Sequence, residues 1–318
     1  MRVLNNDDYK LFERLVSLSQ KELKQAMANF LKKKYENYIF TKNYLVAIGD
    51  IPIALVAHLD TVFKTPVSNL YYDQKKGILW SPEGLGADDR AGVFAIIKIL
   101  QSGYRPSVIF TTDEEAGGIG ANALANDYVD CPIPNLKYMI ELDRRGTNDC
   151  VFYDCYCPEF VKYVESFGFC EKWGSFSDIS FLMPMWMICG VNLSVGYEDE
   201  HSYVETLNIN TLFDSIRKVK NMLDETDIPD FEYDELKYNA SSWWRGTTDA
   251  SHCNKCKKFY TDYELIPVKG LNREKKYYCP DCVVGNIDWC DLCQEAFEIS
   301  DTNRNRRICK ECAESIYV

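Results

Sequence analysis

Apolar residues recur at helical spacing near the start of the chain, between residues 8 and 34. They occupy positions 11, 15, 18, 23, 27, 30 and 31. The stretch ends in three lysines at residues 32–34, and cations near the C-terminal end of a helix are stabilised by its dipole. The pattern predicts one amphipathic helix.

Short apolar runs then alternate with helical patterns. Strands are predicted over residues 38–49, 52–62, 107–113, 137–143, 151–156 and 187–195, with a hairpin over 70–81. Helices are predicted over residues 89–102, from 120 onward, over 158–168 and over 208–223. This alternation predicts a three-layer α/β domain with a largely parallel central sheet. Such sheets bind ligands at the carboxyl ends of their strands.

The pattern weakens after the last predicted helix. Residues 226–250 are acidic and then polar, with no clear period, although Trp243 and Trp244 could anchor them. Beyond them the cysteines crowd together. We therefore expect an α/β domain over residues 1–225, a linker over 226–250 and a small module over 251–318.

Charge and hydropathy argue against some classes of function. The formal net charge of −12 disfavours binding to nucleic acid or to an anionic membrane. No run of 18 apolar residues occurs, and the first residues carry acids where a signal peptide needs a basic and then an apolar stretch. These features predict a cytoplasmic protein that does not span a membrane.

Residues able to bind metal occur at the ends of predicted elements in the first third of the chain. His58 lies in the segment AHLDTV of a predicted strand, and Asp60 can receive the second imidazole N–H, which fixes the tautomer of a ligating histidine. Asp88 opens the turn into the helix at 89–102.

Three further segments complete the pattern. Glu114 and Glu115 are adjacent carboxylates after a strand, so one can ligate while the other acts as a base. Asp143 stands at another strand end, and His201 is one of only three histidines in the chain. Nitrogen and oxygen donors of this kind suit two metals of borderline hardness, such as zinc.

Five motifs that contain these residues resemble those of the co-catalytic zinc exopeptidase superfamily, which includes peptidase T, the aminoacylases and bacterial zinc aminopeptidases. They are AHLDTV, GADDRAGV, TTDEEAGGIGA, ELDRRG and EHSYVET, in the same order, across roughly residues 45–225. The resemblance implies that His58, Asp88 and Asp143 bind one metal ion. It also implies that Asp88, Glu115 and His201 bind a second, so that Asp88 bridges the pair.

The resemblance further implies metal-assisted hydrolysis of a peptide or small amide, with Glu114 as general base and Asp60 as the residue that orients His58. The two catalytic ions would be zinc, or else cobalt or manganese. Peptidase T and the aminoacylases carry a lid domain between the last two motifs, and here Asp143 and His201 are too close in sequence to hold one. The layout is nearer to that of the single-domain aminopeptidases.

Three functions fit these residues. An aminopeptidase or dipeptidase is favoured, and an N-acyl amidohydrolase acting on a small molecule is the variant of it. The alternative class is a non-catalytic peptidase fold whose C-terminal module recruits a partner. A decayed enzyme should have lost a ligand or the base, and none is missing.

The C-terminal cysteines form four CxxC pairs, which predict two structural zinc ions in a tandem zinc-ribbon or zinc-finger module. The pairs are Cys253 and Cys256, Cys279 and Cys282, Cys290 and Cys293, and Cys309 and Cys312. Sequential use of the pairs is favoured, and a cross-braced arrangement stays open. His252 is expected to be a bystander, and the module could contact a protein partner or a second copy of the chain.

Four other residues carry two interpretations each. Ser177 and Asp178 could approach the substrate, although a helix N-cap is the simpler role. Arg144 and Arg145 could hold a substrate carboxylate or pair with nearby acids.

Overall fold

An eight-stranded sheet lies at the centre of the N-terminal unit in the part of the chain that the structure describes. The structure is a computed structural model. It describes residues 4–153, 155, 157–174, 176–234, 253–256, 266–269, 275–283, 287–290 and 296–298. The chain divides into two units, Met1–Asn239 and Ala240–Val318, each of which is described by itself.

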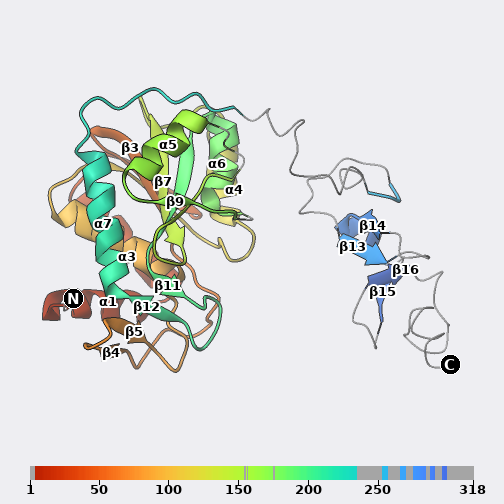
Figure 1. Cartoon of the computed structure of the whole chain (residues 1–318), viewed down its shortest axis with the longest axis horizontal. Coiled ribbons are helices and arrows are strands. Elements are labelled where there is room, and N and C mark those ends of the chain that lie inside the picture. Colours follow the sequence, from red (N-terminus) through yellow and green to blue (C-terminus); the bar gives the residue numbers. More distant parts are fainter. Residues whose placement is uncertain are drawn as a thin grey trace. The chain divides into compact units, whose positions relative to one another are not determined.

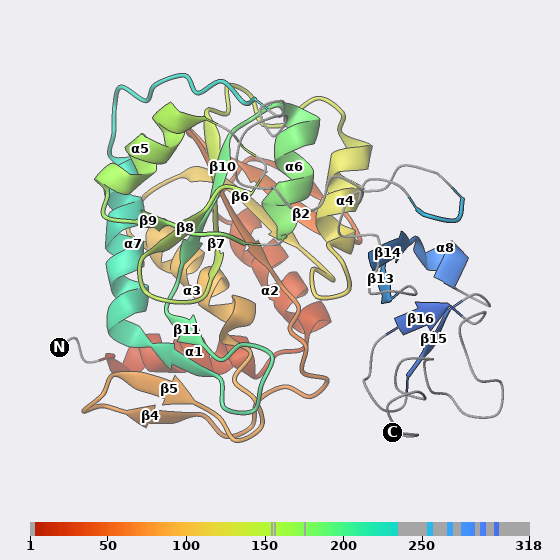
Figure 2. The same ribbon diagram turned by 45° about the vertical axis from the view of Figure 1, so that its right-hand side comes forward.

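The sheet runs in the order β1-β2-β6-β3-β7-β10-β8-β9. Figure 1 labels β3, β7 and β9 in it, and Figure 2 labels β2, β6, β10 and β8. Its strands are β1 (Asn37–Phe40), β2 (Tyr44–Ile48), β3 (Ile51–His58), β6 (Pro106–Thr111), β7 (Tyr138–Arg144), β8 (Asp149–Val151), β9 (Cys170–Glu171) and β10 (Gly190–Ser194). The four central strands, β6, β3, β7 and β10, are mutually parallel. β2 and β8 join this block antiparallel, so the predicted largely parallel sheet is confirmed with antiparallel additions at its sides.

Helices cover both faces of the sheet. On one face α3 (Ala87–Gln101) packs on β3 and β7, with α1 (Asn6–Val16) and α7 (Ile209–Leu223) against it. On the other face α4 (Ile119–Asp127) and α6 (Asp178–Trp186) pack against each other and reach β2, β3, β7 and β10. α5 (Pro158–Ser166) contacts β9. The sheet strands read as almost continuous apolar runs because both of their faces are buried.

The predicted opening helix is in fact two helices, α1 and α2 (Gln20–Lys32). Ser19 breaks the pattern, because its hydroxyl accepts a hydrogen bond from the N–H of Glu22 while the Glu22 carboxylate accepts one from the N–H of Ser19. This reciprocal pair starts a new helix. The single-helix prediction was wrong, because the apolar spacing continues across the break.

Two predicted strands have different bounds in the structure. The segment at 38–49 forms two strands, β1 and β2, paired as a hairpin. The strand expected at 151–156 lies earlier, as β8. A second sheet, in the order β11-β12-β5-β4, contains the predicted hairpin; its strands are β4 (Tyr71–Asp73), β5 (Ile78–Trp80), β11 (Tyr197–Glu198) and β12 (Thr206–Asn208).

The described part of the second unit holds a small sheet in the order β14-β13-β16-β15. Its elements are β13 (Ile266–Lys269), β14 (Lys275–Tyr278), α8 (Pro280–Val283), β15 (Ile287–Trp289) and β16 (Ala296–Glu298). A cluster of buried residues that includes Cys253, Val268 and Cys279 forms its interior.

The residues that follow α7 pack against the rest of the first unit. Tyr233 is buried, and the ring of Phe231 lies 4.9 Å from that of Phe160 and 5.2 Å from that of Tyr163. The first part of the segment whose composition suggests a linker therefore contributes to the core of Met1–Asn239. In the described part of the chain no helix is long and apolar enough to cross a membrane.

Candidate metal centre

His58 is the last residue of β3 and is completely buried. Its Nδ1 lies 3.4 Å from Oδ1 of Asp60. The two oxygens of Asp60 also accept hydrogen bonds from the backbone N–H groups of Glu114, at 3.1 Å, and Glu115, at 3.0 Å. Asp60 therefore lies beside the imidazole, at the position of a residue that orients a ligating histidine, and it fixes the turn that carries both glutamates.

Asp88 lies between the two histidines of the site. Its Oδ1 is 3.0 Å from Nε2 of His58, and its Oδ2 is 3.2 Å from Nε2 of His201. Burial opposes ionisation of Asp88, yet hydrogen bonds from His201 and His58 hold the pKa of this carboxyl well below its usual range. A carboxylate with each oxygen turned to a different imidazole has the geometry of a bridging ligand.

One histidine is on each side of the centre, and their exposure differs. The His58 side chain is 1% exposed and the His201 side chain is 50% exposed. His201 has φ of 61°, a left-handed conformation that is uncommon outside glycine and often found at functional sites. The centre is therefore closed on the His58 side and open to solvent on the His201 side.

The remaining candidate ligands complete two groups of donors. Asp143 Oδ1 lies 3.5 Å from Nε2 of His58, and Glu115 Oε1 lies 3.0 Å from Nε2 of His201. One oxygen or nitrogen atom from each of His58, Asp88 and Asp143 falls within 4.8 Å of the others, as does one from each of Asp88, Glu115 and His201. The structure thus brings together all five residues that the sequence proposes as catalytic metal ligands.

Glu114 is also buried beside the centre. Atoms of His58, Glu114 and Glu115 form a third group within 4.8 Å. Burial raises the pKa of Glu114 to about 9, and nearby carboxylates including Asp143 add to the shift. Burial likewise raises the pKa of Glu115 to about 7, with the charge of Asp88 acting in the same direction.

The donor set fits divalent cations. Three carboxylates and two imidazoles converge, and closely spaced buried carboxylates repel one another unless positive charge lies between them. Oε1 of Glu115 is buried and faces Nε2 of His201 at 3.0 Å, so these two atoms could share a metal ion. Mixed nitrogen and oxygen donors of this kind suit zinc and its neighbours.

Several neighbours hold Asp143 in place. The Ser177 hydroxyl donates to Oδ2 of Asp143 at 3.0 Å, and the Tyr197 hydroxyl lies 3.2 Å from its Oδ1. Ser177 occupies the N-cap position of α6, but its hydroxyl contacts the candidate ligand. Asp178 is fully buried and accepts a hydrogen bond from Thr111.

Sequence reasoning missed Glu205. This buried carboxylate accepts hydrogen bonds from the backbone N–H of Gly86, at 2.7 Å, and from that of Asp88, at 3.0 Å. Gly86 has φ of 63°, and a Cβ at this position would come within 3.0 Å of Cγ2 of Thr61, so the turn into α3 is tight. Glu205 lies four residues after His201 in the same motif, which was the one available signal.

The two arginines after Asp143 pair with nearby groups. Arg145 lies 2.8 Å from the Glu200 carboxylate. Arg144 donates to the carbonyl of Trp173 at 3.3 Å and lies 3.9 Å from Asp149. These contacts match the simpler of the two expected roles.

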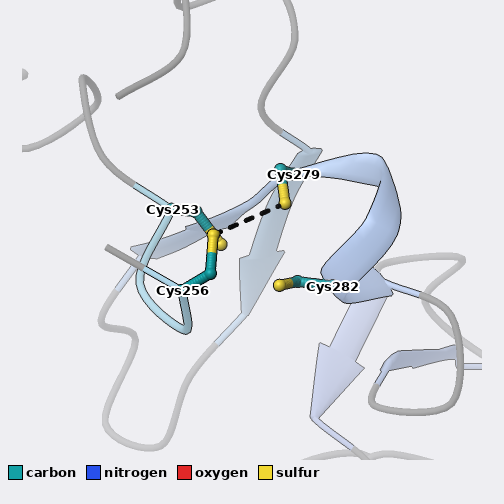
Figure 3. A group of neighbouring side chains, drawn as sticks. All are labelled: Cys253, Cys256, Cys279 and Cys282. Carbon is teal, nitrogen blue, oxygen red and sulfur yellow. Dashed lines mark hydrogen bonds between the residues drawn. The ribbon is translucent and has the colours of Figure 1, made fainter. Parts of the chain in front are cut away.

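A second candidate site lies in the C-terminal unit. The sulfur atoms of Cys253, Cys256, Cys279 and Cys282 fall within 4.8 Å of one another (Figure 3). Burial opposes ionisation of Cys253, but backbone hydrogen bonds from Cys256, Cys279 and Lys255 hold its pKa at about 6. Four converging sulfurs fit a tetrahedral zinc ion, and the grouping is that of sequential rather than cross-braced pairs.

The rest of the cysteine module is described only in part. Cys290 is buried. Cys293, Cys309, Cys312 and His252 lie outside the described residues, as do Trp243 and Trp244. The second predicted structural zinc site and the expected bystander role of His252 therefore remain predictions.

Comparisons with known proteins agree with this geometry. Residues 21–157 match the sequence profile described as Peptidase family M28. No curated protein matches the chain.

Three solved structures share the fold of the chain. A tripeptidase from Staphylococcus aureus superposes with a TM-score of 0.54 at 16% identity, over 70% of this chain and 98% of its own. A TET aminopeptidase from a marine sediment archaeon of the Thaumarchaeota gives 0.56 at 13%, over 70% and 98%. An aminopeptidase from the archaeon Desulfurococcus kamchatkensis gives 0.51 at 14%, over 69% and 95%.

These findings confirm two predictions. The likeness to the solved structures confirms the α/β fold. The profile match confirms the resemblance to co-catalytic zinc exopeptidases. It also confirms the prediction that the chain is a metallopeptidase.

Proposed function

We propose that the chain, whose residues 21–157 match the profile of Peptidase family M28, is an aminopeptidase that would hold two zinc ions with Asp88 as their shared ligand. The observation that carries the proposal is the position of this carboxylate, with Oδ1 at 3.0 Å from His58 and Oδ2 at 3.2 Å from His201. Cobalt or manganese could replace zinc, because the donors are nitrogen and oxygen atoms.

Five side chains would hold the ions. His58, Asp88 and Asp143 would bind one, and Asp88, Glu115 and His201 the other. When bound, such a pair of ions activates water at neutral pH and polarises the carbonyl of the bond to be cut.

Glu114 supplies proton transfer in this proposal. Its carboxylate is buried beside the centre, and its backbone is fixed by the hydrogen bond to Asp60. Two cations would counter the burial and the negative neighbours that raise its pKa, and would leave Glu114 able to accept a proton from the attacking water and pass it to the leaving amine. Asp60 keeps His58 in the orientation needed for ligation.

The substrate is proposed to be a short peptide with a free amino end. Three solved proteins with this fold, a tripeptidase and two aminopeptidases, support this class. The complete set of ligands and base favours an enzyme over a non-catalytic scaffold, since a scaffold has no need to keep each of them.

The C-terminal module is proposed to be structural. The four clustered sulfurs of Cys253, Cys256, Cys279 and Cys282 would bind one zinc ion, and the last four cysteines a second. We also propose that the module lies beyond a catalytic domain predicted over residues 1–225 and a linker predicted over 226–250, with the domain extended to include Phe231 and Tyr233, and that it contacts a protein partner or another copy of the chain.

The test is a hydrolysis panel of purified full-length protein. Aminoacyl anilides, dipeptides and tripeptides are compared with the same tripeptides bearing an N-acetyl group, in the presence of zinc, cobalt or manganese. We expect release of the first residue from free tripeptides and little cleavage of the acetylated ones. Preference for the acetylated compounds would instead indicate an N-acyl amidohydrolase, and inactivity on every compound would favour the scaffold.

A further inference from the structure

A cavity of about 620 Å³ opens beside the candidate metal centre. Asp60 and Glu115 of the centre line it. Leu18, Ser19 and Gln20 line it too, and they belong to the α1–α2 turn, defined here as residues 17–20. The N-terminal helices, far from the other site residues in sequence, therefore reach the cleft in which a substrate would lie.

Gln20 joins this turn to the segment that carries the two glutamates. Its Nε2 donates to Oδ1 of Asp113 at 2.9 Å, and the backbone N–H of Asp113 donates to Oε1 of Gln20, also at 2.9 Å. Asp113 directly precedes Glu114 and has φ of 58°, so the backbone bends sharply there. One amide thus fixes both the side chain and the backbone of the residue before the proposed base.

Arg90 makes a second connection. Its buried guanidinium donates to the carbonyl of Leu18 at 3.0 Å and to that of Leu59 at 2.6 Å. Leu59 lies between His58 and Asp60 in the chain. The α1–α2 turn is therefore tied to both segments that shape the centre.

We propose that Gln20 is a positioning residue for Glu114, and that the α1–α2 turn acts as a fixed wall of the substrate cleft. The inference rests on the proposed peptidase function. Two hydrogen bonds on Asp113 limit how far the Glu114 backbone can move, and displacements of about 1 Å at a catalytic group can cost about a hundredfold in rate. No lid domain fits between Asp143 and His201, and in this proposal the α1–α2 turn provides the fixed wall on its side of the cleft.

The first experiment removes the amide while keeping its length. Gln20→Met in the full chain should lower kcat on a tripeptide by about 10- to 100-fold, because the base is less well held. KM, metal content and the unfolding temperature should change little. The matched control is Gln25→Met, on the same helix, where the exposed amide donates to Oδ1 of Asn29 at 3.2 Å.

The second experiment restores the contact with its donors and acceptors exchanged. Gln20→Glu alone should lower kcat at least as much as Gln20→Met, because two carboxylates then face each other. In the double variant Gln20→Glu with Asp113→Asn, the new amide donates to the new carboxylate and the backbone N–H of position 113 keeps an acceptor. The double variant should regain most of the lost kcat, and Asp113→Asn completes the cycle.

Three outcomes decide the inference. A fall in kcat at unchanged stability, reversed in the double variant, supports it. Unchanged kcat in Gln20→Met, or a fall matched by lost metal or a lower unfolding temperature and not reversed, overturns it. Inactive wild-type protein would contradict the proposed peptidase function itself, which separates that failure from this one.

Discussion

Glu205 accepts a hydrogen bond of 3.0 Å from the backbone N–H of Asp88, although 117 positions separate the two residues in the chain. The same carboxylate accepts a bond of 2.7 Å from Gly86. Glu205 thereby ties the segment after His201 to the turn that presents the proposed bridging ligand. Such outer partners orient metal ligands, and their loss typically costs about 10- to 100-fold in metal affinity or activity.

Glu205→Ala should therefore weaken catalytic metal binding and lower activity by about 10- to 100-fold. Metal content after gel filtration and kcat at saturating zinc are the measurements. Glu198→Ala is the matched control, since Glu198 is an exposed carboxylate on the neighbouring strand β11. A variant that keeps its metal and its activity would show that Glu205 is dispensable to the centre.

The adjacent glutamates should separate in their effects. Glu114→Gln is expected to keep the metal ions and the fold while lowering kcat by about a hundred- to ten-thousand-fold, the usual contribution of a general base. Glu115→Gln should instead lose metal from the group formed with Asp88 and His201. Elemental analysis beside kcat tests both, and the reverse pattern would exchange the two assigned roles.

Much of the catalytic half could be predicted from local patterns. His58 and Asp143 stand in apolar strands, and parallel strands end at one edge of a sheet, so their side chains meet. The resemblance then assigned Asp88, Glu115 and His201, and the structure brings these five residues together. Their roles as ligands stay predictions until metal is measured.

Other features could not be predicted because their cause lies far away in sequence. Gln20 carries no local signal, and Glu205 carries only its place in the motif of His201; each contacts a segment about a hundred residues distant in the chain. The division of the opening helix was predictable in principle, because Ser19 and Glu22 have the spacing of a capping box. The apolar spacing continues across Ser19, however, and it predicted a single helix.

Metal removal should distinguish two pools. Native protein should carry close to four metal ions, two held by carboxylates and imidazoles and two by thiolates. Mild chelation should remove the first pool with the activity, because the catalytic centre is open on the His201 side. The second pool should resist, since a closed four-thiolate site leaves no position for a competing ligand and its metal contributes to folding.

The check on this prediction is elemental analysis before and after a mild chelator, with activity and unfolding followed together. Restoring zinc should restore activity. If only two ions are present and both leave with the activity, the cysteines do not form zinc sites.

The last prediction concerns the division of the chain. All the proposed catalytic residues lie between His58 and His201, within the unit Met1–Asn239. Phe231 and Tyr233 belong to its core, so a truncation must come after them. A fragment of residues 1–239 keeps these contacts and is large enough to bury its own core.

We therefore expect the 1–239 fragment to be folded, to bind the two catalytic metal ions and to hydrolyse a tripeptide with kcat close to that of the full chain. A shorter fragment of residues 1–225 is the informative comparison. It removes Phe231, whose ring packs against Tyr138, Phe160 and Tyr163, and so it should unfold at a lower temperature. Thermal unfolding, metal content and kcat are measured on both. If the longer fragment is folded and fully metallated yet inactive on every substrate that the full chain cleaves, the cysteine module is part of the active site, and its proposed structural role is wrong.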